Sequence, residues 1–531
     1  MKSQASDKIQ ARPMRRQFDL GSIATTGDIL RQSADKYGAK PALISGDDSY
    51  SFAVMDALAN QFANAVCKLD FEPQSKIAIM CRNGHEYVAA HFGAAHTRNV
   101  LVHLSTRYAP SELVHILNLT RAKLIIVDAD TAKIVNSVRQ ELDEMPELIG
   151  IGDDLPGDVE SFEDFIAGQP ETAPQVDIHP EDPCSILFTG GTTGKPKGAI
   201  TSHAARIISG AAAVEDHPIL ENDVAAITTP LCHAAGMFSW FQPAICAGAT
   251  CVLMQRWHPG EFVQAVERYG ITGAFVVPAQ LVGLLDDPNF SPERLQTLRS
   301  INCGGALASD DTVERIERLL PFANFNIAYG STETGHVLTH PPHLRKAKPG
   351  SLGHVGPRIE LKILAPSGKE AVRGDIGEIA TRGVHLFSRY LNEPEQSQNY
   401  FRSVDGWGWT GDLGYMDEDG DVFLVGRSKD IIISGGLNIY PAEIENAVLE
   451  LKEIKECAAF GVPDKEWGEL PVIAVVRQAG CDISPEEIIE HAATRIARYK
   501  RPRAVKFLDK LPYTAGGKIK RQTLRDEFSK T

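Results

Sequence analysis

The sequence predicts an α/β protein whose first two thirds carry mostly parallel sheets, followed by an antiparallel section and a small α+β domain. Short apolar runs of strand type alternate with helical patterns up to about residue 345, as in βαβ units. From Leu361 to Tyr415, Gly-Asp and Asp-Gly pairs separate short alternating runs, which is typical of antiparallel strands. The final stretch of about 100 residues has the size of a small domain.

The first section begins with a helical pattern at Thr26 and continues with a long one from Ser51 to Leu69. The second pattern opens with serine, a residue type that caps helices. Residues 150–183 are rich in Asp, Glu and Pro, so we expect a linker or a surface excursion there. The strands that we expect before this linker are Ala42–Ile44, Ile77–Met80, Val100–Val102 and Leu124–Val127.

A second alternating section follows the linker. Its expected strands are Val224–Thr229, Thr250–Met254, Gly273–Val277 and Ser300–Cys303. Further along, residues 418–421 read Glu-Asp-Gly-Asp, a strong signal for a hairpin turn. We place a boundary near Arg427–Asp430, which divides the chain into domains of residues 1–428 and 429–531.

Composition narrows the classes of function. The formal net charge of −15 disfavours nonspecific nucleic-acid binding and a polybasic membrane anchor. The polar N-terminal residues lack the apolar segment of a secretory signal, and no apolar run reaches the roughly 18 residues of a transmembrane helix. Nine scattered cysteines without a Cys-x-x-Cys pair favour a reducing compartment. We therefore expect a cytoplasmic protein with no nucleic-acid partner and no transmembrane segment.

Residues 189–198, which read Thr-Gly-Gly-Thr-Thr-Gly-Lys-Pro-Lys-Gly after a short apolar run, are a candidate triphosphate site. Glycines let backbone N–H groups turn toward a ligand, and successive N–H groups with hydroxyls and ammoniums bind anions. Because Pro196 disfavours a helical conformation at Lys195, this is not a Walker A loop. The alternative, a solvated loop between two strands, is less consistent with three threonines and two lysines.

Further motifs follow this loop in order. They are residues 230–236 (PLCHAAG), 302–306 (NCGGA), 326–334 (NIAYGSTET), 409–412 (WTGD), 426–430 (GRSKD), 435–436 (GG) and 514–521 (TAGGKIKR). Together they resemble the adenylate-forming superfamily of acyl-CoA synthetases, nonribosomal peptide adenylation domains and firefly luciferase, over roughly residues 25–525. The resemblance implies a large N-terminal domain of layered βαβ subdomains plus a small β-barrel, and a small mobile α+β C-terminal domain.

The resemblance also implies a two-step reaction. A carboxylic acid attacks ATP to give acyl-AMP and pyrophosphate, and the acyl group then passes to CoA, giving acyl-CoA and AMP. ATP, Mg²⁺ and coenzyme A are therefore expected. Charge that develops on phosphoryl oxygens calls for donors, cations and a metal. The resemblance makes Lys518 the catalytic lysine between carboxylate and α-phosphate, Thr332 an α-phosphate contact and Glu333 the Mg²⁺ ligand.

The remaining nucleotide and CoA residues follow from the same resemblance. Lys429 corresponds to the hinge about which the C-terminal domain turns between an adenylation pose and a thioesterification pose. In the second pose Ser434, Gly435 and Gly436 would face the CoA channel. The expected ATP-binding residues are Thr189, Gly190, Gly191, Thr192, Thr193, Gly194, Lys195 and Lys197 at the phosphates, Gly304, Gly305, Ala306, Asn326, Tyr329, Gly330 and Ser331 around the adenine and α-phosphate, and Asp412 and Arg427 at the ribose.

The acyl group is expected to lie against three segments, residues 233–240, 275–284 and 335–338. These segments hold apolar and small side chains but no Arg or Lys, which disfavours a dicarboxylic acid and favours an apolar fatty, aryl or alicyclic monocarboxylic acid. His233 would be near the substrate without acting as an acid or base. The residues that we expect to bind the acid are His233, Ala234, Ala235, Met237, Val276, Gly335 and His336.

Other readings stay open. A stand-alone adenylating enzyme that loads a carrier-protein thiol would share every nucleotide residue. A luciferase-type oxygenase and a non-catalytic nucleotide-binding protein are more distant alternatives, and the presence of Lys518, Glu333 and Asp412 argues against the last. The expected partners are the small molecules carboxylic acid, ATP and CoA, and a homodimer is left open.

Overall fold

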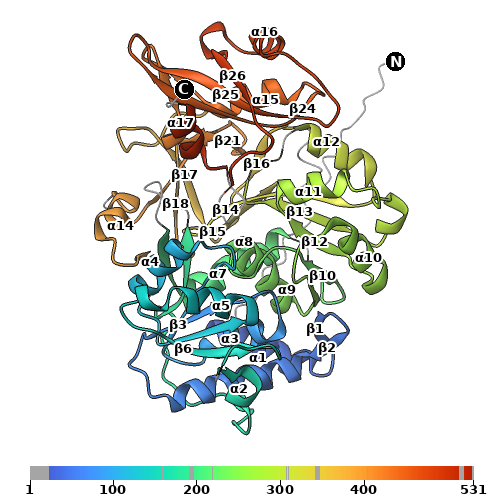
Figure 1. Ribbon diagram of the computed structural model, residues 1–531, viewed down its shortest axis with the longest axis vertical. Helices are drawn as coiled ribbons and strands as arrows, with labels where there is room; N and C mark the ends of the chain where they lie inside the picture. The colour runs from blue at the N-terminus through green and yellow to red at the C-terminus, as the bar shows by residue number, and fades with distance from the viewer. Residues whose placement is uncertain are drawn as a thin grey trace, which may run out of the picture.

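The structure is a computed structural model that describes residues 23–157, 159–189, 196–217, 219–306, 308, 310–340, 347–403, 405–513 and 519–528. It contains two eight-stranded sheets and two five-stranded sheets. In Figure 1 the two large sheets and their helices form the lower part of the molecule, and the C-terminal elements lie at the top. Within the described ranges, no helix is long and apolar enough to cross a membrane.

The first large sheet has the order β19-β9-β8-β4-β3-β5-β6-β7. Strands β8 to β7 along this order are parallel, and β9 and β19 add antiparallel pairs at one edge. Its central strands are almost fully buried, as expected for parallel strands covered on both faces. The strands are β3 Lys76–Met80, β4 Val100–His103, β5 Leu124–Asp128, β6 Glu147–Ile151, β7 Glu160–Ser161, β8 Pro183–Thr189, β9 Lys197–Ser202 and β19 Arg389–Tyr390.

The second large sheet has the order β15-β14-β13-β12-β10-β11-β1-β2. It is parallel from β14 to β1 and carries an antiparallel strand at each edge. The strands are β1 Pro41–Ser45, β2 Asp48–Ser51, β10 Val224–Ile227, β11 Thr250–Leu253, β12 Gly273–Val276, β13 Ser300–Gly304, β14 Asn324–Ser331 and β15 Gly335–His340.

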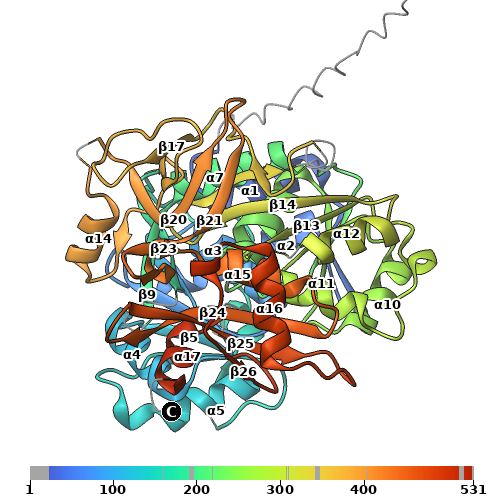
Figure 2. The same cartoon turned by 90° about the horizontal axis from the view of Figure 1, so that it is seen from above.

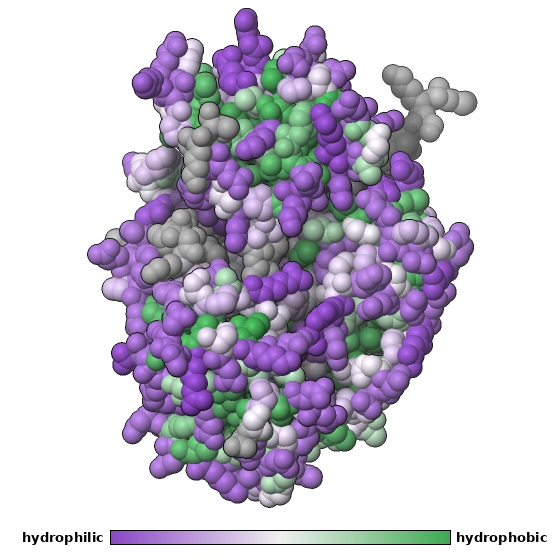
Figure 3. Space-filling view, in the orientation of Figure 1, coloured by the Kyte–Doolittle hydropathy of each residue, from purple (hydrophilic) through white to green (hydrophobic). Residues whose placement is uncertain are grey.

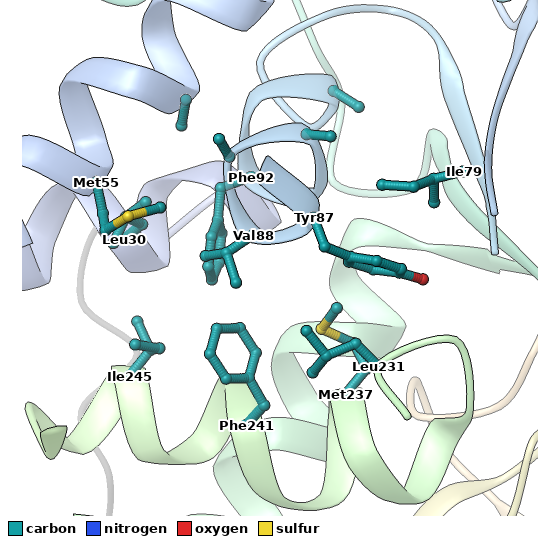
Figure 4. Close-up of a cluster of buried hydrophobic side chains, with 14 of the residues drawn as sticks. Leu30, Met55, Ile79, Tyr87, Val88, Phe92, Leu231, Met237, Phe241 and Ile245 are labelled. Atoms are coloured by element: carbon teal, nitrogen blue, oxygen red, sulfur yellow. The ribbon is translucent and has the colours of Figure 1, made fainter. Parts of the chain in front are cut away.

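Helices between the two large sheets form the main hydrophobic core. Figure 4 shows Tyr87 and Phe92 of α3 facing Met237 and Phe241 of the opposing helical segment. Ser51 caps α2 by accepting a hydrogen bond from Val54 N at 3.2 Å, so the predicted start of this helix is confirmed. The central helices are α1 Thr26–Tyr37, α2 Phe52–Lys68, α3 His85–Ala94, α7 His203–Asp216, α8 Ala234–Gly236, η2 Met237–Phe241 and α9 Gln242–Ala247.

Helices α4 Pro110–Thr120 and α5 Ala129–Ser137 cover the outer face of the first large sheet, and α10 Pro259–Tyr269, α11 Pro278–Leu285 and α12 Asp310–Leu319 cover that of the second (Figure 1). The remaining helices of this part are η1 Arg139–Glu141, α6 Phe162–Ile166, η3 Pro292–Leu295 and α14 Pro394–Tyr400.

An antiparallel sheet stands where a small barrel was expected. Its order is β16-β21-β20-β18-β17, and β20 and β21 form the hairpin predicted at residues 418–421. Gly420 takes a φ of +86° in this turn, a conformation that favours glycine. The strands are β16 Ser351–Gly353, β17 Glu360–Leu364, β18 Gly377–Arg382, β20 Gly408–Met416 and β21 Val422–Arg427.

The C-terminal elements build their own sheet and core. The sheet pairs β23-β22-β25-β24, with β26 parallel to β25. Figure 2 shows these elements, in red, gathered over one side of the N-terminal part. On the face in Figure 3 hydrophilic residues predominate, and apolar ones gather over the C-terminal elements near the top. The elements are η4 Ser428–Asp430, β22 Ile432–Ser434, β23 Leu437–Ile439, α15 Pro441–Leu449, β24 Ile454–Asp464, β25 Gly468–Arg477, α16 Pro485–Arg495, η5 Arg498–Lys500, β26 Ala504–Phe507 and α17 Arg521–Phe528.

The predicted α/β class, with a large N-terminal domain and a smaller C-terminal one, is confirmed, but the predicted linker at residues 150–183 is wrong in part. This stretch contains β7 and α6. Phe162 and Phe165 of α6 pack against Phe62 of α2, with ring centroids 5.7 and 5.9 Å apart. Apolar residues three and four positions apart form one helix face, a signal that the acidic composition of the stretch concealed.

Gly93 lets α3 lie close against α2. A β-carbon at this position would be 2.4 Å from Ala59 O and 2.9 Å from a ring carbon of Phe62. Neither neighbour is the free end of a flexible side chain, so the two helices would have to separate.

We therefore predict that Gly93→Ala destabilises the protein by about 1–3 kcal/mol, the usual cost of overpacking a core. The matched control is Gly283→Ala in α11, where a β-carbon would be 3.8 Å from Pro259. The control should be neutral or stabilising by up to about 1 kcal/mol, because alanine favours helix over glycine. Thermal unfolding midpoints measure both, and equal midpoints would contradict the prediction.

Candidate nucleotide and acyl site

The turn between β14 and β15 places Thr332 and Glu333 at the end of a strand. Ser331 N donates to Thr334 Oγ1 at 2.9 Å, and Thr334 N donates to Ser331 Oγ at 3.2 Å. A β-carbon on Gly330 would be 2.1 Å from Gly335 O, so only glycine fits the narrow base of this turn. The turn lies beyond the carboxyl ends of the parallel strands, where open α/β sheets bind ligands.

The Glu333 carboxylate is held by a tyrosine that the sequence reasoning missed. Tyr390 Oη donates to Glu333 Oε1 at 2.8 Å. Burial and the nearby Glu333 raise the pKa of Tyr390 above its usual range, so the hydroxyl stays protonated as a donor. Lys197 Nζ lies 5.8 Å from the centroid of the same ring, which brings the end of the Gly-rich loop to this carboxylate.

The segment of residues 387–391 links these parts through the backbone. Phe387 N donates to Glu333 O at 2.8 Å, and Leu391 N donates to Gly198 O at 2.8 Å. Between them Ser388 N donates to Ile200 O at 2.7 Å. One short segment therefore connects the β14–β15 turn to strand β9, which follows the Gly-rich loop.

A second carboxylate, Asp412, is fixed from two sides. It lies opposite Arg427 in the β20–β21 pair, and Arg427 Nε is 2.7 Å from Asp412 Oδ1. Tyr329 Oη donates to Asp412 Oδ2 at 2.8 Å. The neighbouring Asp412 raises the pKa of Arg427, and Glu333 adds a weaker effect in the same direction. Each carboxylate oxygen can accept a further hydrogen bond, so a diol can still bind Asp412.

The expected adenine residues do not all lie on one face. Gly304 approaches β14 closely, since its β-carbon would be 2.9 Å from Ala328 O. Asn326 Nδ2 donates to Asn302 Oδ1 at 2.9 Å and to Ser300 Oγ at 3.2 Å inside the sheet. Asn326 and Tyr329 are three residues apart in β14, so their side chains project to opposite faces. The structure thus separates the Asn326 amide from the Tyr329–Asp412 pair.

The expected acyl residues are likewise divided. Gly335 and His336 adjoin α7: His336 N donates to Ser209 Oγ at 2.9 Å, and its Nε2 lies 2.9 Å from Asp216 Oδ2. Met237 is fully buried in the core between the sheets, and Val276 in the core on the other face of the second sheet. Half-buried His233, Ala234 and Ala235 form the start of α8.

Arg206 of α7 is a second residue that the sequence reasoning missed. Its Nη2 donates to Thr332 O at 3.5 Å, so it lies directly behind the β14–β15 turn. Arg206 lies outside residues 233–240, 275–284 and 335–338, the segments expected to line the acyl group. Only the packing of α7 between the sheets brings Arg206 to the turn, so the sequence carries no signal for this contact.

The structure describes only part of the Gly-rich loop and of the C-terminal motif. Gly190–Lys195 and Lys518 lie outside the described residues. The ends of the Gly-rich loop are placed, because Thr189 and Lys197 are paired across the β8–β9 ladder. The loop therefore connects two adjacent antiparallel strands and is followed by no helix at Lys197, as expected from Pro196.

The predicted hinge and CoA residues lie in the C-terminal part. Lys429 is in η4, where burial lowers its pKa against the opposing effect of Asp430. Ser434, Gly435 and Gly436 form the β22–β23 turn, with φ values of +58° and +78° at the two glycines. Trp467 covers Gly435, since a β-carbon there would be 2.8 Å from the indole ring.

Comparison with known proteins agrees with this geometry. The family model for AMP-binding enzymes matches residues 30–391, and that for the AMP-binding enzyme C-terminal domain matches residues 443–518. Indoleacetate–CoA ligase of Aromatoleum aromaticum is 32% identical, covering 92% of this chain and 94% of the relative. A CoA ligase of Rhodococcus jostii for a propanoyl acid with a methyl-dioxo-octahydro-indenyl ring is 31% identical, covering 95% and 98%.

A carrier-protein ligase and a solved CoA ligase structure are also similar to this chain. The fatty acid–acyl-carrier-protein ligase ScoC of Streptomyces coeruleorubidus is 31% identical, covering 92% of this chain and 93% of the relative. The solved structure of the anthranilate CoA ligase AuaEII with anthranoyl-AMP superposes with a TM-score of 0.87 at 27% identity, covering 95% and 97%. The chain belongs to the AMP-binding enzyme family of the adenylate-forming superfamily and is an AMP-forming acid–thiol ligase.

Proposed function

We propose that this enzyme is an ATP-dependent acyl-CoA synthetase. It forms acyl-AMP from a carboxylic acid with release of pyrophosphate, and then transfers the acyl group to CoA with release of AMP. The observation that carries the proposal is the arrangement of two carboxylates, Asp412 held by Arg427 and Tyr329 and Glu333 held by Tyr390. One carboxylate suits a ribose diol, and the other stands where a phosphate-bound cation would lie.

The nucleotide residues take the following roles in this proposal. Asp412 and Arg427 hold the ribose, and Tyr329 keeps the Asp412 carboxylate in place. Lys197 and the Gly190–Lys195 loop bind the β- and γ-phosphates, with Thr332 at the α-phosphate. Each contact acts by positioning and by offsetting negative charge, which is what phosphoryl transfer requires.

Glu333 is the protein ligand for Mg²⁺ in this proposal. Among the described residues no group of three His, Cys, Asp or Glu side chains could hold a metal. A lone carboxylate next to the phosphate site fits Mg²⁺, which commonly takes one or two protein carboxylates and completes its shell with phosphate oxygens and water. The bound cation would neutralise charge on the phosphates, and Tyr390 orients the carboxylate for it.

The acid is proposed to be an apolar fatty, aryl or alicyclic monocarboxylic acid. The small, half-buried side chains of Ala234 and Ala235 at the start of α8 are consistent with an apolar acid. The ring acids named for the relatives, indoleacetate and the indenyl propanoate, support the aryl and alicyclic classes. The free cysteines, six of them buried, support a cytoplasmic location.

The C-terminal domain is proposed to span residues 429–531 and to turn about Lys429. In the adenylation pose Lys518 would bridge the carboxylate and the α-phosphate. In the second pose the Ser434–Gly436 turn would face the pantetheine thiol of CoA. Glycines at 435 and 436 permit close backbone approach, and one active site is used twice.

We predict that Tyr390→Phe raises the Mg²⁺ concentration for half-maximal acyl-AMP formation by about 10-fold or more, the usual effect of removing a group that orients a metal ligand. The matched control is Tyr400→Phe in the same aromatic cluster, since Tyr400 Oη has no hydrogen-bond partner in the described part of the chain. ATP–pyrophosphate exchange over a Mg²⁺ titration measures both. Equal shifts in the two variants would contradict the role of Tyr390.

We predict that Lys518→Ala lowers acyl-AMP formation by about 100-fold or more, as loss of a transition-state charge contact does. Conversion of preformed acyl-AMP to acyl-CoA should be largely spared, because that step does not join carboxylate and phosphate. Lys520→Ala is the control, an exposed lysine two positions on. Equal losses in both half-reactions would show that Lys518 does not have this role.

The identity of the thiol acceptor is tested separately. A carrier-protein ligase is the second candidate, which the likeness to ScoC favours. We expect thioester formation with free CoA to saturate and to exceed that with a pantetheine-bearing carrier protein. Acyl-AMP formation without transfer to CoA, combined with efficient transfer to the carrier, would favour the second candidate.

A further inference from the structure

A buried arginine lies at the acyl side of the site. Arg206 in α7 has no exposed surface, and its guanidinium stacks on Phe238, with Cζ 4.4 Å from the ring centroid. Nη2 donates to Thr332 O at 3.5 Å. This is the only hydrogen bond of the guanidinium within the ranges that the structure describes, because Nε and Nη1 have no acceptor there.

The charge of Arg206 is not compensated by its surroundings. Burial lowers its pKa to about 10, so the side chain is still a cation at neutral pH. No carboxylate of the described residues forms an ion pair with it. An unpaired buried charge is strongly unfavourable, and a protein that keeps one at a ligand site gains when the ligand supplies the missing acceptor.

The polar neighbours of Arg206 are neutral. Burial lowers the pKa of His91 to about 3 and that of His385 to about 4, and Arg206 adds to both shifts. Burial, and to a smaller extent His91 and Arg206, also lower the pKa of His103. Its Nδ1 is 2.7 Å from Tyr87 Oη. Neutral imidazoles cannot offset the charge of the guanidinium.

Arg206 also borders the residues expected to contact the acid. A β-carbon at Gly335 would lie 3.9 Å from Arg206 Nη1. Phe238, on which the guanidinium stacks, follows Met237 directly in η2, one turn beyond Ala234. Thr332 O, which accepts from Nη2, belongs to the residue proposed to contact the α-phosphate. The guanidinium atoms that lack an acceptor are therefore next to Gly335, one of the residues expected to contact the acid.

We propose that Arg206 recognises a second oxygen acceptor on the acid, remote from the reacting carboxylate, and so selects ring or chain acids that carry a ketone or a second carboxylate. The inference rests on the proposed acyl-CoA synthetase activity and replaces the apolar monocarboxylic acid by an acid with a second oxygen acceptor. It also revises the expectation that no basic side chain would lie near the acid. Phe238 beside the guanidinium supplies an apolar face for the body of such a substrate.

The test uses three cyclohexylpropanoates. The ring carries no oxygen in the first acid, one ketone in the second and one carboxylate in the third. For the wild-type enzyme we expect kcat/KM to be higher for at least one oxygen-bearing acid than for the plain ring. In Arg206→Met that ratio should fall roughly 100-fold, since a site built around a hydrogen bond discriminates strongly. Arg206→Lys should restore part of the ratio. The oxygen-bearing acid whose kcat/KM ratio falls in Arg206→Met shows whether Arg206 binds a ketone or a carboxylate.

The matched control is Arg477→Met. Arg477 also stacks on a phenylalanine, with Cζ 3.6 Å from the Phe507 centroid, and also donates to a main-chain carbonyl, Ile483 O at 2.8 Å. It lies in the C-terminal sheet, so the ratio should not change there. Replacing a buried cation by Met of similar volume is often neutral for stability, and thermal unfolding checks this for Arg206→Met.

Each of the following results would overturn the inference. If an active wild-type enzyme shows no preference for either oxygen-bearing acid, or if Arg206→Met leaves the ratio unchanged, Arg206 does not read the acid. If Arg206→Met lowers kcat/KM equally for all three acids, its role is to support the Thr332 turn. If the wild-type enzyme forms no acyl-CoA from any of the three acids, the proposed function is refuted for ring acids, and this inference is refuted with it.

Discussion

The structure depends on the packing of helices between two eight-stranded sheets. Aromatic and aliphatic side chains from α3 and from the η2–α9 segment meet there, with Phe92 and Phe241 among the largest (Figure 4). Burial of this apolar surface removes it from water and fixes the relative position of the sheets. The β14–β15 turn, strand β9 and helix α7 all extend from these sheets, so their approach to one another follows from that core.

Two carboxylates, those of Glu333 and Asp412, each accept a hydrogen bond from a tyrosine hydroxyl. Tyr390 donates to Glu333 and Tyr329 donates to Asp412, each at 2.8 Å. A neutral hydroxyl fixes the direction of a carboxylate without cancelling its charge. Asp412 is also paired with Arg427, whereas Glu333 has no ion pair among the described residues. Glu333 is thus held by a neutral donor, whereas Asp412 is held by a neutral donor and by a cation.

Much of the fold could be predicted from the sequence because parallel strands buried on both faces read as short apolar runs. The proximity of the expected residues within the β14–β15 turn and within the β20–β21 pair could be predicted because each set is contiguous in sequence or joined by one hairpin. Tyr390 could not, because its position depends on pairing with β9, nearly two hundred residues earlier in the chain. The contact of Arg206 with the turn could not be predicted for the same reason, whereas the odd spacing of Asn326 and Tyr329 in β14 already predicts that their side chains project to opposite faces.

The 387–391 segment gives the site a mechanical property. It is bonded to the Glu333 backbone at one end and to the Gly198 backbone at the other. A strand held at both ends transmits displacement instead of absorbing it. A displacement of β9 at Gly198 is therefore carried along this segment to the backbone of Glu333. The position of the β14–β15 turn thus depends on the strand that follows the Gly-rich loop.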